Sequence, residues 1–332
     1  MALLFMDGFD AADYLIKWSP GTGTYGSSTS TNFSVGRSVY MYAAGGYLKK
    51  VFAPVSQVFV GFAMFQDASP TPNQAFLTIL GDNSATSHLT VQFTNTTTLT
   101  VARGGTTLAS ATVTQRTAWG NYFEVSASID DTVGQCIVRV NGVTVINFTG
   151  DTKNGGTNTT IDAVAIGDYG AYNQVCYFDD LYLCDSTGSA PYNTFLGEVR
   201  ISTLSPNGAG SSTQFTPSSG ANYTTVDELP YSTTDYVQDT TSGHRDTYTF
   251  SDVGSTTTIF GVQNSIIAKK TDVSSISLKP AVKSGATVYY GTTTALTTAD
   301  SIIRNIHIVD PNTSAAWTQS GVNALEAGFE VA

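Results

Sequence analysis

The alternation of apolar and polar residues between Tyr122 and Asp185 constrains the fold of this chain more than any other feature. Four segments there follow the period-2 pattern of half-buried strands: residues 122–130, 135–141, 143–149 and 175–184. Asn141 and Gly142 separate the second segment from the third, and Asn-Gly is the strongest short signal for a hairpin turn. The stretch therefore predicts a twisted antiparallel sheet.

The composition extends this expectation to the whole chain. Hydrophobic residues make up 41% of the 332 residues, whereas charged residues make up only 12%, about half of the usual share. Threonine, which favours strands, and glycine, asparagine and serine, which favour turns, take the place of the missing charges. We therefore predict an all-β protein, and the many short strand candidates predict an antiparallel β-sandwich.

The length suits two domains. We expect a sandwich over residues 1–188 and a smaller β-rich domain over residues 189–332, joined near the polar stretch 185–191. In the second domain we expect a strand at residues 195–201 and an exposed loop at residues 206–213. A short C-terminal helix is expected at residues 320–327, capped by Ser320.

The net charge excludes some classes of binding partner, and the spacing of the cysteines predicts the state of their thiols. The net charge of −11 argues against binding to nucleic acid or to an anionic membrane, which needs basic surface. The apolar stretches are too short to insert in a bilayer, and the first residues are expected to form a strand rather than a signal peptide. Cys176 and Cys184 would lie roughly 26 Å apart on one strand, so we expect free buried thiols.

The first half of the chain resembles a laminin-G-like or concanavalin-A-like jelly roll. The segments that carry this resemblance are Trp119 with residues 122–125, then residues 138–143, 164–167 and 178–182. The opening residues 3–10 resemble the start of such domains in structural proteins of tailed phages. The resemblance implies a concanavalin-A-like sandwich and is specific for the fold rather than for an activity.

The second half resembles a module of uncharacterised phage virion proteins. This resemblance is carried by residues 195–201, 204–208, 223–228 and 310–313, and by the ending 317–328. It implies a virion protein that is made in the host cytoplasm and assembles, in a tail, in a fibre or on the capsid surface, with other virion proteins and with copies of itself. The alternative is a carbohydrate-binding adhesin that recognises glycans on the host surface.

Reactive groups are sparse in the sequence. Glycosidases need two carboxylates that flank the sugar, but none of the five glutamates belongs to such a cluster, and Asp179 and Asp180 are expected to point to opposite faces of their strand. The three histidines lack the spacing of a zinc site, and no Gly-x-Ser-x-Gly motif occurs. We therefore expect no catalytic residues and predict that the chain is not an enzyme, with a glycan-degrading enzyme as the third hypothesis.

The residue types nevertheless suggest two candidate binding sites, one for Ca²⁺ and one for a glycan. Structural Ca²⁺ takes oxygen ligands, and the candidates at the rim of the sandwich are Asp7, Asp10, Asp168, Asp179 and Asp180. Otherwise no cofactor is expected. A glycan would stack on exposed aromatic rings, and the polar loop that contains Tyr169, Tyr172 and Asn173 fits this role. Alternatively, these tyrosines cover the edge of the sandwich or contact another subunit.

Overall fold

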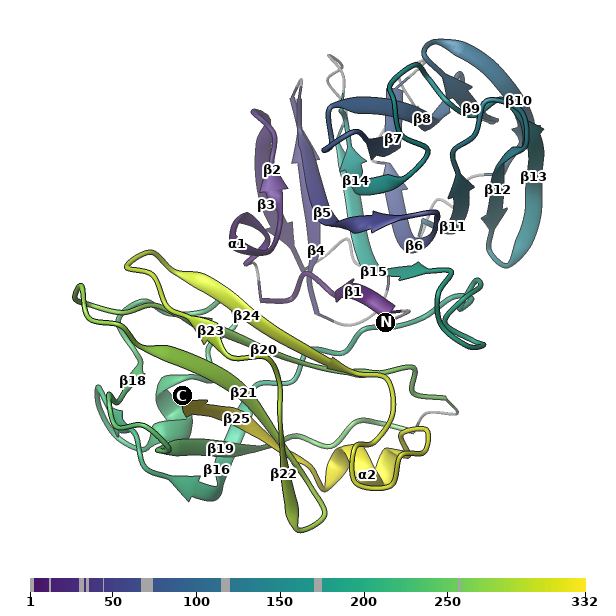
Figure 1. Ribbon diagram of the computed structural model, residues 1–332. Coiled ribbons are helices and arrows are strands. Elements are labelled where there is room, and N and C mark those ends of the chain that lie inside the picture. Colours follow the sequence, from purple (N-terminus) through teal and green to yellow (C-terminus); the bar gives the residue numbers. More distant parts are fainter. Residues whose placement is uncertain are drawn as a thin grey trace. The chain divides into compact units, whose positions relative to one another are not determined.

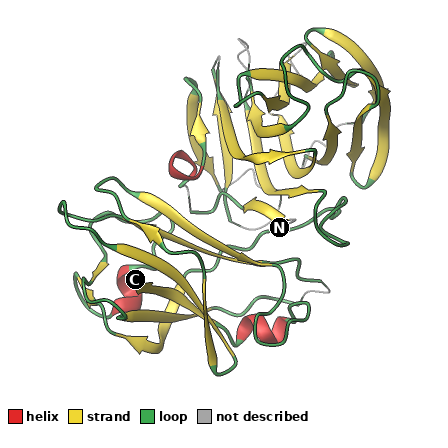
Figure 2. Ribbon diagram, in the orientation of Figure 1, coloured by secondary structure: helices red, strands yellow, loops and turns green. Residues whose placement is uncertain are grey.

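The computed structural model describes residues 3–11, 13–29, 33, 36–43, 45–66, 74–114, 120–169, 175–255 and 258–332. The chain divides into two compact units, Met1–Ile201 and Ser202–Ala332. Strands dominate both units (Figures 1 and 2), which confirms the predicted all-β class. Residues 189–201 belong to the first unit.

One sheet of the first unit, sheet A, contains eight strands among the described residues. Its order is β13 (Val143–Gly150), β12 (Gly134–Val140), β11 (Asn121–Ser128), β6 (Gln57–Gln66), β15 (Cys176–Asp185), β4 (Ser38–Tyr42) and β3 (Thr24–Ser28), and β1 (Leu3–Asp7) pairs with β15. All neighbours are antiparallel. Asn141 and Gly142 adopt φ values of 50° and 79° between β12 and β13, which confirms the predicted turn.

The second sheet, sheet B, contains seven strands among the described residues. Its order is β10 (Thr106–Thr112), β9 (Thr98–Arg103), β8 (Thr86–Phe93), β7 (Gln74–Gly81), β14 (Ile161–Gly167), β5 (Tyr47–Val55) and β2 (Ser19–Pro20). The short helix α1 (Tyr14–Lys17) precedes β2. Strands that are distant in the sequence, such as β14 and β5, are neighbours in this sheet.

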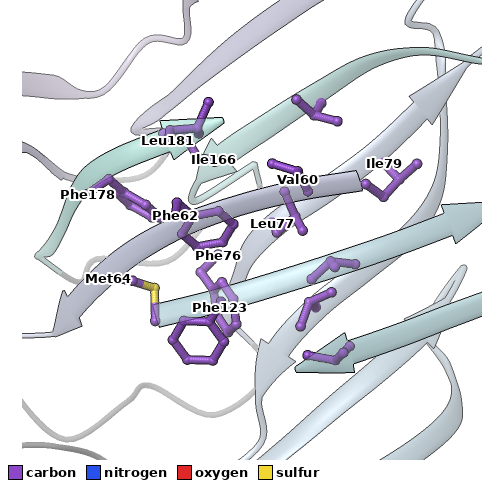
Figure 3. Close-up of a cluster of buried hydrophobic side chains, with 14 of the residues drawn as sticks. Val60, Phe62, Met64, Phe76, Leu77, Ile79, Phe123, Ile166, Phe178 and Leu181 are labelled. Atoms are coloured by element: carbon purple, nitrogen blue, oxygen red, sulfur yellow. The ribbon is translucent and has the colours of Figure 1, made fainter. Parts of the chain in front are cut away.

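The two sheets enclose one large apolar core (Figure 3). The ring of Phe62 on β6 packs with Phe76 of β7 and Phe123 of β11 at centroid distances of 6.2 and 6.0 Å, and the latter two rings are 4.9 Å apart. All three side chains are buried, and each such burial contributes about 1.5–3 kcal/mol. The core thus joins sheet A to sheet B, and the predicted antiparallel sandwich is confirmed.

Strand β15 departs from regular alternation at Asp179 and Asp180. Phe178 and Leu181 both belong to the core, although residues three apart on a regular strand point to opposite faces. The pairing of β15 with β6 also shifts between Asp179 and Tyr182. Asp180 has a φ of 51°, as residues in β-bulges often do. The expectation that the two aspartates point to opposite faces is wrong, because the bulge leaves both of them between two core residues.

Residues 195–201, here called the covering segment, contain no strand. Backbone amides of this segment donate to side chains of sheet A instead: Leu196 to Tyr182, Gly197 to Glu124 and Ile201 to Asp180. The predicted strand is wrong because these donors are satisfied by side-chain oxygens rather than by a neighbouring strand. The covering segment therefore lies on the outer face of sheet A.

The second unit is built around a six-stranded sheet, sheet C, as counted over the described residues. Its order is β16 (Pro206–Thr213), β19 (Arg245–Phe250), β25 (Glu326–Val331), β21 (Ser277–Ser284) and β22 (Thr287–Tyr290), and β23 (Thr294–Ala295) also pairs with β21. Two further pairs are β17 (Thr216–Pro217) with β18 (Val237–Gln238), and β20 (Val262–Ala268) with β24 (Ser301–His307). A 3₁₀-helix, η1 (Asn222–Thr225), follows β17.

Two predictions for this unit need correction. Residues 206–213 form strand β16 at the edge of sheet C, not a loop, because their backbone pairs with β19. The C-terminal helix exists, but α2 (Gln319–Asn323) is capped by Thr318, whose hydroxyl accepts from the Gly321 amide. It ends early because residues from Glu326 onward enter the centre of sheet C.

The three cysteines are free and buried, as expected. Trp317 is 4% exposed and packs with Val322 of α2. Within the described part of the chain, none of the helices has the length and apolar character needed to cross a membrane.

Candidate functional site

The outer face of sheet B presents two tyrosine rings over a floor of small side chains. Tyr47 on β5 and Tyr169, just after β14, have ring centroids 4.5 Å apart. Both rings are partly buried and pack on Leu80, Ala163 and Ala165. We call these five residues, together with Thr78 and Lys49 described next, the tyrosine face.

The register of sheet B places two polar side chains beside the rings. Ala165 lies opposite Thr78 of β7 on one side and opposite Lys49 of β5 on the other, so all three side chains share the outer face. Lys49 and Tyr47 are two positions apart on one strand and also share that face. Thr78 and Ala165 are both 0% exposed, so other atoms cover them.

Within the described part of the chain, the hydroxyl groups of the tyrosine face have no hydrogen-bond partner. Thr78 is fully buried, and its Oγ1 makes no hydrogen bond. Among the described residues, no side-chain hydrogen bond involves the Tyr47 or Tyr169 hydroxyl. Burial raises the pKa of Tyr169, and the nearby Tyr47 raises it further. The Tyr47 and Tyr169 side chains are partly exposed, so their hydroxyls can bond to a ligand. The unsatisfied Thr78 hydroxyl, which costs about 1–3 kcal/mol, is covered.

The sequence singled out only part of this site. Tyr169 lies in it, whereas Tyr172 and Asn173 fall outside the described residues. Tyr47 was missed because it is remote from Tyr169 in the sequence. The pattern Tyr47-Leu48-Lys49, with Leu48 fully buried, would have placed Tyr47 and Lys49 on one outer face, but not next to Tyr169.

A second aromatic row crosses the outer face of sheet A near its β3 edge. Phe65 of β6, Tyr177 of β15 and Tyr40 of β4 are cross-strand neighbours with centroid distances of 5.9 and 5.7 Å. Tyr42 continues the row, with 42% of its surface exposed. The rings contact one another, and the Tyr40 ring also lies over Gly26 of β3, where a Cβ atom would come within 2.2 Å of it. The row is therefore a second aromatic surface of the sandwich.

Farther along the same face, one rung of sheet A contains buried polar groups. Arg139, Glu124, Gly61 and Tyr182 lie opposite one another on β12, β11, β6 and β15. The Tyr182 hydroxyl donates to Glu124 Oε1 at 2.7 Å, and Arg139 Nη1 lies 3.2 Å from Glu124 Oε2. The Tyr182 ring lies over Gly61, where a Cβ atom would come within 2.1 Å of it.

The covering segment closes this polar rung. Glu124 and Tyr182 are 0% and 1% exposed, and Phe195 packs its ring edge against Phe59, with the Arg139 guanidinium 5.1 Å from the Phe195 ring centre. Burial raises the pKa of Tyr182 well above its ordinary value, and the nearby Tyr122 and Glu124 raise it further. The rung is therefore shielded from water in this arrangement.

The neighbouring carboxylates Asp179 and Asp180 are also held by the chain itself. Asp179 accepts from the amides of Asp180 and Phe33 at 2.8 and 2.9 Å, and Asp180 accepts from the Ile201 amide at 2.7 Å. Burial, followed by the charge of Asp180, raises the pKa of Asp179 to about 8. At neutral pH this carboxyl is therefore mainly protonated.

Of the remaining aspartates proposed for Ca²⁺, Asp10 lies close enough for its charge to raise the pKa of Asp179. Asp7 accepts from the Phe9 amide, the Lys17 ammonium and the Trp18 indole, and Asp10 accepts from the Arg37 amide. Asp168 is buried near the end of β14. The described residues contain no group of three or more His, Cys, Asp or Glu side chains that could hold a metal ion. The calcium site stays a prediction.

His88 also fails as a metal ligand. Its Nδ1 accepts from the Asn154 amide at 3.2 Å, so a neutral ring carries its proton on Nε2. That nitrogen points toward Asp82 Oδ2, 3.8 Å away. Burial lowers the pKa of His88, although Asp82 opposes this effect. A protonated Nε2 has no lone pair for a metal.

Comparisons with known proteins do not assign the chain to a family. No protein-family model matches the chain, and no curated protein matches it. A protein of unknown function with a galectin-like fold from Bacillus subtilis matches 56% of this chain and 96% of its own chain, with 12% identity and a TM-score of 0.35.

Two similar structures carry the names of enzymes. A sialidase matches 56% of this chain with 12% identity and a TM-score of 0.36, and the match spans 19% of the sialidase. A conserved carbohydrate esterase from the Shiga toxin-encoding bacteriophage phi24B matches 51% of this chain and 89% of its own, with 12% identity and a TM-score of 0.35.

The prediction that the chain is not an enzyme is contradicted by these matches, which are mainly to enzymes: sialidases, alginate lyases and the carbohydrate esterase. The features missing from the sequence are a glycosidase carboxylate pair and motifs that are contiguous in the chain. Catalytic groups can instead come from several distant strands, and lyases and esterases do not require that pair. The low TM-scores assign no reaction to this chain.

Proposed function

We propose that the chain is a glycan-binding protein of a tailed-phage virion and that the tyrosine face contacts the glycan. The observation that carries this proposal is the pair of partly exposed rings, Tyr47 and Tyr169, set 4.5 Å apart over alanine side chains. Aromatic rings offer an apolar face for a sugar ring, and hydroxyl groups without partners offer hydrogen bonds at its edge.

The virion location rests on the sequence resemblance of both halves to phage structural proteins. In that setting one unit attaches to the particle, and the sandwich displays its outer face to the host surface. Partners would be other virion proteins and copies of this chain, which commonly follow cyclic symmetry. The low charged fraction of 12% suits close repeated contact between such copies.

Glycan binding is tested by probing the full chain on an array of bacterial and other polysaccharides. Tyr47→Ala and Tyr169→Ala are each expected to weaken binding by about tenfold, since an aromatic contact is worth about 0.5–1.5 kcal/mol beyond its buried area. Tyr236→Ala is the matched control, because Tyr236 is a 47% exposed tyrosine of the second unit. If Tyr40→Ala abolishes binding and Tyr169→Ala does not, the site lies on sheet A.

Virion membership has a separate test. Mass spectrometry of purified particles should detect the chain in many copies, and antibody labelling in electron micrographs should place it on the tail, the fibres or the capsid surface. Absence of the chain from intact particles would overturn the virion assignment without affecting glycan binding.

A further inference from the structure

Lys49 differs from the other basic residues of this chain. It lies on β5 with an intermediate exposure, next to Tyr47 and opposite Ala165. No described residue forms an ion pair, a hydrogen bond or a ring contact with it. Every other described lysine and arginine has at least one such contact or another electrostatic interaction.

This isolation is notable in a chain with 26 acidic and 15 basic residues. With acidic groups in excess, most cations find a carboxylate or a carbonyl nearby. The neighbours of Lys49 on the tyrosine face are apolar side chains and hydroxyl groups, so its positive charge is not neutralised there. A partly desolvated cation without a counter-ion attracts an anion more strongly than a solvated one does.

Resting on the proposed glycan binding, we propose that the tyrosine face takes an acidic sugar whose anionic group pairs with Lys49. The sugar ring would lie against Tyr47 and Tyr169, whose rings are 4.5 Å apart and partly exposed. A lysine ammonium is a compact point charge, so it accepts a carboxylate or a sulfate group, and the two must be separated by experiment.

The experiment compares three ligands that share one scaffold: lactose, 3′-sialyllactose and 3′-sulfolactose. Isothermal titration with the full chain should show at least one acidic form binding about tenfold more tightly than lactose, because a charge-assisted hydrogen bond is stronger than a neutral one. The preferred acidic form identifies the anion. Raising the ionic strength should reduce the difference.

Variants of Lys49 test whether its charge causes the preference for the acidic sugar. Lys49→Met keeps much of the apolar stem and removes the charge, so it should abolish the preference for the acidic form, whereas Lys49→Arg should retain most of it. Lys269→Met is the matched control, since it removes an equal charge from the second unit, where Lys269 pairs with Asp300. Retention of the full preference in Lys49→Met would overturn the inference.

The failures of the two proposals can be distinguished. If lactose and its acidic derivatives bind equally and Tyr169→Ala weakens all of them, glycan binding stands and the acidic preference is wrong. If neither these sugars nor any array glycan binds, both proposals are wrong.

Discussion

The contact between Tyr182 and Glu124 allows a quantitative test of what holds the covering segment on sheet A. The Tyr182 hydroxyl donates to Glu124 Oε1 at 2.7 Å and accepts from the Leu196 amide at 3.1 Å. Tyr182→Phe removes both bonds and keeps the ring over Gly61. Glu124→Gln keeps the shape of the side chain and removes its charge.

The expected loss of unfolding free energy follows from the hydrogen-bond partners of the Tyr182 hydroxyl. A hydrogen bond to a charged group contributes about 1.5–3 kcal/mol, and the unsatisfied Leu196 amide adds roughly 1 kcal/mol. Tyr182→Phe should therefore lower the free energy of unfolding of the sandwich by about 2–4 kcal/mol. In Glu124→Gln, Arg139 loses its counter-ion but is one quarter exposed and can be hydrated. The two changes share one bond, so the double variant should lose about 1–2 kcal/mol less than the sum.

Denaturant unfolding measures these free energies, and hydrogen exchange of the peptide that spans Leu196 and Gly197 reports on the covering segment directly. Both single variants should speed that exchange. Tyr42→Phe is the matched control in the same unit, since no described residue bonds its hydroxyl, and it should change little. Additive effects, or unchanged exchange in Tyr182→Phe, would refute the view that this bond holds the segment.

Three further predictions concern single groups. Because the folded state raises the pKa of Asp179 from 3.8 to about 8, it keeps a proton that the unfolded state loses, so the free energy of unfolding falls as the pH rises through this range. Asp179→Asn should flatten that dependence in denaturant titrations from about pH 4 to pH 8. Burial raises the pKa of each cysteine to about 12, so DTNB at mildly alkaline pH should label none in the native protein and all three after unfolding. Gly61→Ala should destabilise the sandwich by about 2–4 kcal/mol, because the new Cβ displaces the Tyr182 ring from Glu124. Calorimetry should show no such loss for Gly254→Ala, where nothing lies within 4 Å.

Local sequence patterns predicted the parts of the fold that depend on local chemistry. The Asn141-Gly142 turn needs two left-handed residues, and the chain supplies the two types that tolerate them. Alternation in residues 122–128 placed Phe123 and Val125 in the core. The same rule failed at Asp179 and Asp180, because a bulge breaks the period without any signal in the residue types.

Features that depend on distant partners could not be predicted in this way. Residues 195–201 alternate like a strand, but their amides bond to Glu124, Asp180 and Tyr182, which only the folded sheet brings together. Lys49 likewise lacks a counter-ion because the fold places no acidic side chain of the described residues beside it, and the sequence does not show this placement. Tyr169 could be recognised as a candidate, whereas its contact with Tyr47 required the register of β5 with β14.

The covering segment also determines where the sandwich can be cut. A fragment that stops at residue 188 would lack the amides that satisfy Glu124 and Asp180, and it would expose two carboxylates and the Phe59 ring to water. Such a fragment would lose these hydrogen bonds and the packing of Phe195 on Phe59 without any change in its strands. Expression of the sandwich by itself should therefore extend through Ile201, and a shorter product should be prone to aggregate.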